Sequence, residues 1–384
     1  MSSPRRGLVL GAGGVLGAAW MIGALCALEE EIGLDATKVD ALLGTSAGSV
    51  VAALLAAGVS PHEQRAHQRG EVLDGSPLAE VEFDYALGGR PPAPWPGVGS
   101  ARLLAAVVRD RRLLSAPVVL AGLVPRGRGS VQALAELIEQ ILPDWPKHPR
   151  LQTVAMDYDA GGRVALGRPE GDGLIVPAQA VAASCAIPGW FAPVEIDGRV
   201  YVDGGTTSIA SADLIAGHRL DEVYVVAPLA WLASPNSMGP SLWMLQHWRR
   251  ALTRQLNREV EHLRAEGTQV TIIAPSAEDL VALGTNPMDE HRRLEVLETS
   301  MRTSRATVRG MRRARLGQAT VRRSPDGRTS GHNGGRKSGG PASKSSEGER
   351  GGASNGGKRG GNSGNGKGRG GRSGGAASRR RDER

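Results

Sequence analysis

Short apolar runs and longer alanine-rich segments follow one another along the first part of the chain. The run at 8–10 predicts a buried strand, and residues 18–30 predict a helix after a glycine-rich loop. A second apolar run predicts a strand that ends at Gly44, and the apolar residues 50–57 predict a helix. Strands that alternate with helices in this way are typical of a parallel α/β sheet.

Further segments of both kinds follow in the second half of the chain. Apolar runs predict strands at 151–156, 163–166, 194–196, 199–202, 222–227 and 269–274. Longer periodic segments predict helices at 178–186, 240–265 and 287–316. Asp197-Gly198 lies between two of the runs and is a strong signal for a two-residue hairpin turn. The arginines of the last helix predict a solvated basic face, and the whole pattern predicts an α/β protein with a mostly parallel central sheet.

Residues 61–150 interrupt this pattern. A proline-rich stretch at 91–97 predicts an irregular surface loop, and apolar segments at 103–108 and 113–124 are separated by arginines. We expect an inserted helical subdomain here. A lid, or a helix pair that faces lipid, is the alternative interpretation.

The net charge of +8 is distributed unevenly. Residues 321–384 carry a net charge of +11, whereas residues 1–320 carry −3, so the high isoelectric point reflects the tail. The tail is rich in Gly, Ser, Asn, Lys and Arg and cannot bury a core, which predicts a folded domain over 1–320 and a disordered extension after it. The extension is expected to add solubility, with weak contact to an anionic partner as the alternative. It lacks aromatic residues, so specific nucleic-acid readout is not expected.

Two features of the sequence indicate the cellular compartment of the protein. Cys26 and Cys185 are the only cysteines, too few for a disulfide framework, and they suit a reducing environment. Arg5-Arg6 precede an uncharged run at 7–28 that superficially resembles a signal peptide or a membrane span. Its six glycines suit a strand, a loop and a helix better. We therefore expect a cytoplasmic protein, with peripheral contact at a membrane surface left open.

The stretch Gly44-Thr45-Ser46-Ala47-Gly48 carries the first candidate chemistry. It has the pattern G-x-S-x-G at a predicted strand-to-helix junction, which is the pattern of a nucleophile elbow. Gly44 and Gly48 have no Cβ, so the turn can be tight and the helix can lie close to the strand. The serine oxygen then lies beside a helix N-terminus that favours developing negative charge. Ser46 is the candidate nucleophile, against the alternative of a structural serine in a tight turn.

Two glycine-containing stretches complete the candidate site. The loop from Gly11 to Gly17 does not fit a dinucleotide-binding G-x-G-x-x-G, because Leu16 stands where the third glycine is required. Free backbone N–H groups beside a nucleophilic serine favour an oxyanion hole instead. Asp203-Gly204-Gly205 follows a predicted strand, and its aspartate is the candidate base.

The glycine loop, G-T-S-A-G and D-G-G, in this order, resemble the patatin-like phospholipase family. The stretch 183–189, which leads through the hairpin to D-G-G, resembles the same family, and the resemblance covers residues 7–275. It implies a three-layer α/β/α fold and hydrolysis of acyl esters in phospholipids or lysophospholipids, without a metal or cofactor. It also implies a Ser–Asp dyad: Ser46 attacks the ester carbonyl, Asp203 accepts its proton, and an acyl-Ser46 intermediate forms. The implied oxyanion donors are the N–H groups of Gly13 and Gly14, with Gly11 as a further candidate.

One departure and two alternatives accompany this resemblance. The family's glycine loop commonly carries a basic residue where Leu16 stands, which weakens the phospholipid assignment more than the esterase assignment. A Ser–Asp–His esterase remains open because His218 follows the acid. A non-catalytic lipid-binding α/β module is the alternative from a different class.

Overall fold

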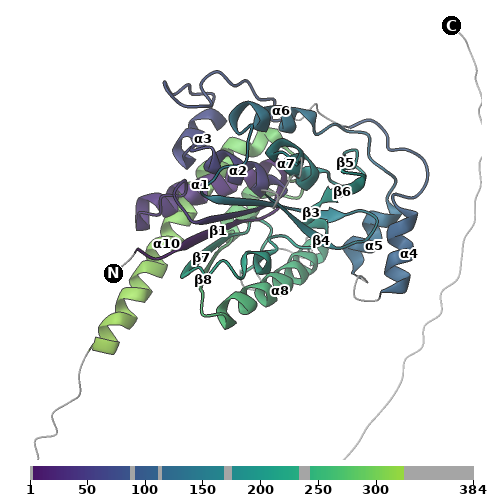
Figure 1. Cartoon of the computed structure of the whole chain (residues 1–384). Coiled ribbons are helices and arrows are strands. Elements are labelled where there is room, and N and C mark those ends of the chain that lie inside the picture. The colour runs from purple at the N-terminus through teal and green to yellow at the C-terminus, as the bar shows by residue number, and fades with distance from the viewer. Residues whose placement is uncertain (1–2, 87–90, 111–114, 168–174, 233–242, 324–384) are drawn as a thin grey trace, which may run out of the picture. The chain divides into compact units, whose positions relative to one another are not determined.

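An eight-stranded sheet forms the centre of the protein (Figure 1). The computed structural model describes residues 3–86, 91–110, 115–167, 175–232 and 243–323, and for 243–248 and 315–323 it describes the backbone alone. The expected tail at 321–384 lies outside these residues, apart from the last residues of a helix that ends at Arg323. All described elements fall in one compact unit, Met1–Pro325.

The strand order is β5-β6-β3-β2-β1-β7-β8, and β4 pairs with β3. β1, β2, β3, β7 and β8 pair in parallel, whereas β4, β5 and β6 join antiparallel. The predicted mostly parallel α/β sheet is thus confirmed. The strands are β1 (Arg6–Leu10), β2 (Ala41–Thr45), β3 (Arg150–Asp157), β4 (Arg163–Gly167), β5 (Val194–Ile196), β6 (Arg199–Asp203), β7 (Glu222–Val226) and β8 (Gln269–Ile273).

Side chains that alternate along the strands build a core on each face of the sheet. In β1, Leu8 and Leu10 belong to one buried cluster and Val9 to another, as the two-residue period of a strand requires. Helices cover both clusters, and Figure 1 shows α8 on the opposite side of the sheet from α1 and α2. On the first face lie α1 (Gly14–Ile32), α2 (Ala47–Ala56), α6 (Gln132–Ile141), α7 (Pro177–Cys185), α9 (Ala277–Leu283) and α10 (Arg293–Arg323); on the second lie α8 (Trp243–Ala265) and the short η3 (Ala212–Ile215).

Three more helices lie in the segment 61–150. α3 (Pro61–Gln68) starts with a capping box, in which Ser60 and Glu63 satisfy each other's backbone N–H groups, and it packs on α1. α4 (Ala101–Arg109) and α5 (Ala116–Leu123) share a small buried cluster with β3 and β6. In the described part of the chain, no helix is both long enough and apolar enough to cross a membrane.

The structure corrects several predicted boundaries. α1 begins at Gly14, inside the predicted glycine loop, and α10 begins at Arg293 after a short helical turn, η5 (Glu290–Arg292). α3 and α6 lie in the segment where a helical insertion was expected, although their positions were not predicted, and α9 was not predicted. Their short lengths leave the helical period indistinct against neighbouring loops.

The predicted solvated basic face of α10 is present, since Arg302, Arg309, Arg312 and Arg313 are exposed, and some of its arginines also bind acidic side chains. Arg305 and Arg309 bind Glu30 and Glu31 at the end of α1, with N–O distances of 2.5 and 2.8 Å. α1 and α10 also approach closely, since the Ser300 hydroxyl donates to the Trp20 carbonyl at 2.6 Å. The arginines therefore attach α10 to the acidic end of α1.

Candidate active site

Ser46 occupies a sharp turn between β2 and α2. Its φ of 54° and ψ of −126° lie in a region that non-glycine residues rarely adopt, and such strain is typical of a nucleophile elbow. A Cβ on Gly48 would lie 2.1 Å from the Leu10 carbonyl oxygen, so α2 sits directly on the end of β1. The close approach predicted for the glycines of this motif is confirmed.

Two serines that the sequence analysis did not assign hold this turn. The Ser46 N–H donates to Ser184 Oγ at 2.9 Å, and Ser184 Oγ donates to the Val154 carbonyl at 2.6 Å. Ser49 Oγ donates to the Ser46 carbonyl at 2.6 Å. Both backbone polar groups of Ser46 are thereby fixed. Ser184 lies within the stretch 183–189 that carries the family resemblance, which was the available signal.

The structure brings Ser46 and Asp203 together. Ser46 Oγ donates to Asp203 Oδ2 at 2.6 Å, and both residues are 5% exposed. β3 explains this proximity, since Thr45 at the end of β2 pairs with Val154 and Asp203 pairs with the next residue, Ala155. The ends of β2 and β6 therefore meet along one strand.

Burial controls the charge of Asp203. Desolvation raises the pKa of its carboxyl group from 3.8 to about 6, although hydrogen bonds from the Ser46 hydroxyl and the Gly205 N–H favour the ionised form. The Gly205 N–H reaches Oδ1 at 2.7 Å. Above about pH 6 the carboxylate can accept a proton from Ser46.

The glycine loop divides into bonded and unbonded N–H groups. Gly11 donates to the Val226 carbonyl at 2.9 Å and Ala12 to the Ile209 carbonyl at 2.7 Å. The prediction of Gly11 as an oxyanion donor is therefore wrong, because its N–H is used between β1 and β7. The N–H groups of Gly13 and Gly14 make no hydrogen bond within the described part of the chain, and both residues line a cavity with Ser46.

Two further residues lie away from the reacting groups. Leu16 is fully buried in the core on the first face of the sheet, so a side chain at this position of α1 faces the core. His218 is half-buried, and burial together with nearby Arg5 and Arg150 lowers its pKa. Those arginines precede or begin β1 and β3, at the sheet edge opposite Ser46. The structure thus provides no Ser–Asp–His triad through His218.

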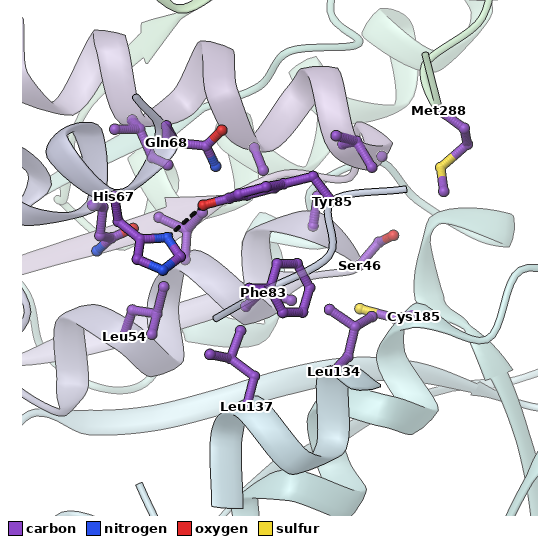
Figure 2. Close-up of a pocket in the computed structure, with 18 of the residues that line it drawn as sticks. Ser46, Leu54, His67, Gln68, Phe83, Tyr85, Leu134, Leu137, Cys185 and Met288 are labelled. Carbon is purple, nitrogen blue, oxygen red and sulfur yellow. Dashed lines mark hydrogen bonds between the residues drawn. The ribbon is translucent and has the colours of Figure 1, made fainter. Parts of the chain in front are cut away.

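A narrow cavity of about 90 Å³ extends from Ser46 between α1, α2 and α6 (Figure 2). Its lining is mostly apolar and includes Val50, Leu54, Phe83, Leu134 and Leu137. Figure 2 shows Ser46 toward one end and a hydrogen bond between His67 and Tyr85, 2.6 Å long, toward the other. The cavity suits an apolar chain.

A second, wider cavity of about 580 Å³ also includes Ser46 in its lining. It contains Asp203, Gly13 and Gly14, and its apolar wall includes Leu120 of α5, a side chain that is 59% exposed. Among the described residues of its lining, Arg249 of α8 and Asp203 are the charged ones. Ser46 therefore lies where a narrow apolar cavity meets a wide one that contains a cation.

A three-layer α/β/α sheet with a serine at a strand-to-helix turn is an architecture of serine hydrolases. Residues 8–213 match the model of the family described as patatin-like phospholipase. This match spans more than half of the chain and includes Ser46 and Asp203, so the chain belongs to the patatin-like phospholipase family. It is accordingly a hydrolase of carboxylic ester bonds, within the general class of lipid acyl hydrolases.

Solved structures give weaker likenesses. VipD from Legionella pneumophila is 15% identical, with a TM-score of 0.37, and the alignment covers 80% of this chain and 67% of that one. The type III effector ExoU is 18% identical (TM-score 0.33, coverage 80% and 53%), and human GIVD cytosolic phospholipase A2 is 13% identical (TM-score 0.37, coverage 83% and 60%). The chain thus spans between half and two thirds of these proteins. No curated protein matches it.

Proposed function

We propose that this protein hydrolyses acyl esters of phospholipids or lysophospholipids with a Ser46–Asp203 dyad. The observation that carries the proposal is the 2.6 Å hydrogen bond from Ser46 Oγ to a buried carboxylate. The strained turn at Ser46 and the adjacent unbonded N–H groups of Gly13 and Gly14 support the same assignment.

Acylation begins when Ser46 Oγ attacks the ester carbonyl carbon and its proton passes to Asp203 Oδ2. The carbonyl oxygen becomes an oxyanion, which the N–H groups of Gly13 and Gly14 stabilise with the N-terminus of α1. The intermediate collapses, the bond to the leaving alkoxide breaks, and the alkoxide takes the proton from Asp203. The products of this half are an alcohol and acyl-Ser46.

Deacylation repeats these steps with water. Asp203 accepts a proton from a water molecule as its oxygen attacks the acyl carbon, and the same donors stabilise the second oxyanion. Collapse releases the fatty acid and returns the proton to Ser46 Oγ. The carboxylate is thus both base and acid, and no histidine takes part.

The apolar cavity beside Ser46 supports an acyl chain as one part of the substrate. The wider cavity, which holds the dyad and the glycine loop, suits the alcohol part of the ester. The exposed Leu120 and Leu123 of α5 lie at or near its wall and support transient contact with a lipid surface.

Fluorophosphonate labelling tests the nucleophile. Wild type should be labelled covalently, Ser46→Ala should not be labelled or turn over ester, and Asp203→Asn should label much more slowly. Ser130→Ala is the matched control, because Ser130 is exposed and lines neither of the two cavities at Ser46. A p-nitrophenyl ester series then measures the preferred acyl length.

Absence of labelling in folded wild type would overturn the dyad and favour a lipid-binding module without catalysis. Labelling that persists in Ser46→Ala would place the nucleophile elsewhere. Ser46→Ala should fold normally, as judged by its circular dichroism spectrum, because the side chain contributes little packing.

A further inference from the structure

Arg249 is a buried cation without an acidic partner in the described part of the chain. It is 5% exposed, and its Nη1 donates to the Pro228 carbonyl at 3.2 Å. Arg163, another substantially buried arginine, differs in this respect because it binds both Asp213 and Glu259. In addition, residues 233–248, which precede Arg249 in the chain, include no Asp or Glu.

Burial of an unpaired charge is unfavourable, so proteins retain such groups where a ligand or a neighbour compensates. Desolvation lowers the pKa of the Arg249 guanidinium to about 10, which still leaves it charged at neutral pH. The guanidinium has five N–H donors, and one of them binds the Pro228 carbonyl. The remaining donors are available to an anion.

The position of Arg249 connects it with the candidate active site. It lines the wide cavity together with Ser46, Asp203 and Gly13. Pro228, whose carbonyl Arg249 contacts, packs against Gly13, because a Cβ on that glycine would lie 2.7 Å from the proline ring. The Asp203 carboxylate accepts hydrogen bonds from Ser46 and Gly205, whereas the Arg249 guanidinium donates to Pro228, so the two groups form no ion pair in the described part of the chain. The cation is therefore in the same cavity as the base but does not neutralise it.

We propose that the Arg249 guanidinium binds the phosphodiester of a glycerophospholipid whose acyl ester lies at Ser46. The inference rests on the proposed function and specifies its substrate class. A phosphodiester lies several covalent bonds from the scissile carbonyl, and a planar guanidinium can bind two of its oxygens at once. The phosphate also compensates the charge that is otherwise buried alone.

The same assignment explains the departure at Leu16. A basic side chain there would face the core, since Leu16 is fully buried on the first face of the sheet. In this chain the cation near the oxyanion donors comes from α8, on the other face. The cation that binds the anion and the glycine loop that binds the oxyanion thus belong to separate elements.

Two substrates that differ in the phosphate head group alone test this role. kcat/KM is measured for 1,2-dioctanoyl-phosphatidylglycerol and for 1,2-dioctanoylglycerol. Arg249→Met, which keeps an unbranched apolar stem but removes the guanidinium, should lower kcat/KM for the phospholipid about 10- to 100-fold and change it less than about threefold for the neutral lipid. Arg249→Lys keeps a charge without the planar fork and should give an intermediate loss. Arg254→Met, an exposed position on the same helix, is the matched control.

Several outcomes would overturn the assignment. If both variants lose kcat/KM equally on both substrates, Arg249 has a structural role: it holds Pro228 and, through it, the glycine loop. An unchanged kcat/KM for the phospholipid in Arg249→Met would show that Arg249 does not bind the phosphate. Wild type that hydrolyses the neutral lipid but not the phospholipid would overturn the Arg249 proposal and leave acyl hydrolysis intact. Failure on both lipids, together with absent fluorophosphonate labelling, would instead remove the proposed function.

Discussion

At the amino edge of the sheet, acidic residues directly before or at the start of the strands bind Arg5 and Arg6. The Arg5 N–H donates to Asp221 and the Arg6 N–H to Asp40, each at 2.7 Å, and Arg6 Nε binds Glu222 at 3.0 Å. At the carboxyl edge, Ser46 has a strained backbone, Gly13 and Gly14 have unbonded N–H groups within the described part of the chain, and Asp203 is buried with hydrogen bonds from Ser46 and Gly205.

The two edges differ in how completely their polar groups are paired and solvated. Charges at the amino edge are paired and partly exposed to solvent, so each pair adds little stability and has little capacity left for a ligand. Groups at the carboxyl edge are desolvated and incompletely paired, so they can form strong hydrogen bonds with the transition state of a reacting ester. The comparison predicts that substitutions at the carboxyl edge change activity, whereas those at the amino edge change stability slightly.

Asp203→Asn should show the largest effect in this comparison. Loss of the base should lower kcat about 100- to 10,000-fold, because the amide cannot accept the Ser46 proton. The free energy of unfolding, in contrast, should be higher in Asp203→Asn than in wild type at neutral pH. Burial raises the pKa of Asp203 from 3.8 to about 6, so wild type loses stability as pH rises through this range and the buried carboxylate ionises. Asparagine does not ionise, so the variant avoids this loss of stability. At 1.36 kcal/mol per pKa unit, the loss is at most about 3 kcal/mol above pH 7.

Urea unfolding at pH 4 and pH 8 measures this change, and Asp221→Asn at the amino edge is the matched control. The control should keep wild-type activity within about twofold and lose about 1 kcal/mol or less, since it weakens an exposed contact. Full activity in Asp203→Asn would show that the base lies elsewhere. An equal advantage of that variant at both pH values would contradict the assigned ionisation.

The pH dependence of wild type should show the next effect. kcat/KM for a neutral ester should fall about tenfold per pH unit below about 6, because the proton that Asp203 then carries prevents it from accepting another. A stopped assay over pH 4.5–8, with circular dichroism at each pH, separates this loss from unfolding. Constant activity down to pH 4.5 would mean that the carboxyl group ionises as an ordinary aspartate.

Local patterns predicted the parts of the fold that local residues determine. The strand and helix around Ser46, and the hairpin that leads to Asp203, follow from short-range periodicity and turn chemistry. Gly11 was misassigned because its N–H partner, Val226, is distant in sequence and becomes known once β1 and β7 pair. Arg249 could not be singled out, since α8 contains several arginines and burial in a tertiary cavity distinguishes this one.

His218→Gln should have the smallest effect, and it sharpens the interpretation of the pH profile. A fall in activity near pH 6 fits an ordinary histidine as well as a buried carboxylate. His218 lies at the amino edge of the sheet, opposite Ser46, where burial and the nearby Arg150 and Arg5 lower its pKa. The variant should keep kcat/KM within about twofold and keep the decline below about pH 6. A loss of several orders of magnitude, or disappearance of that decline, would restore the triad and assign the base to a histidine.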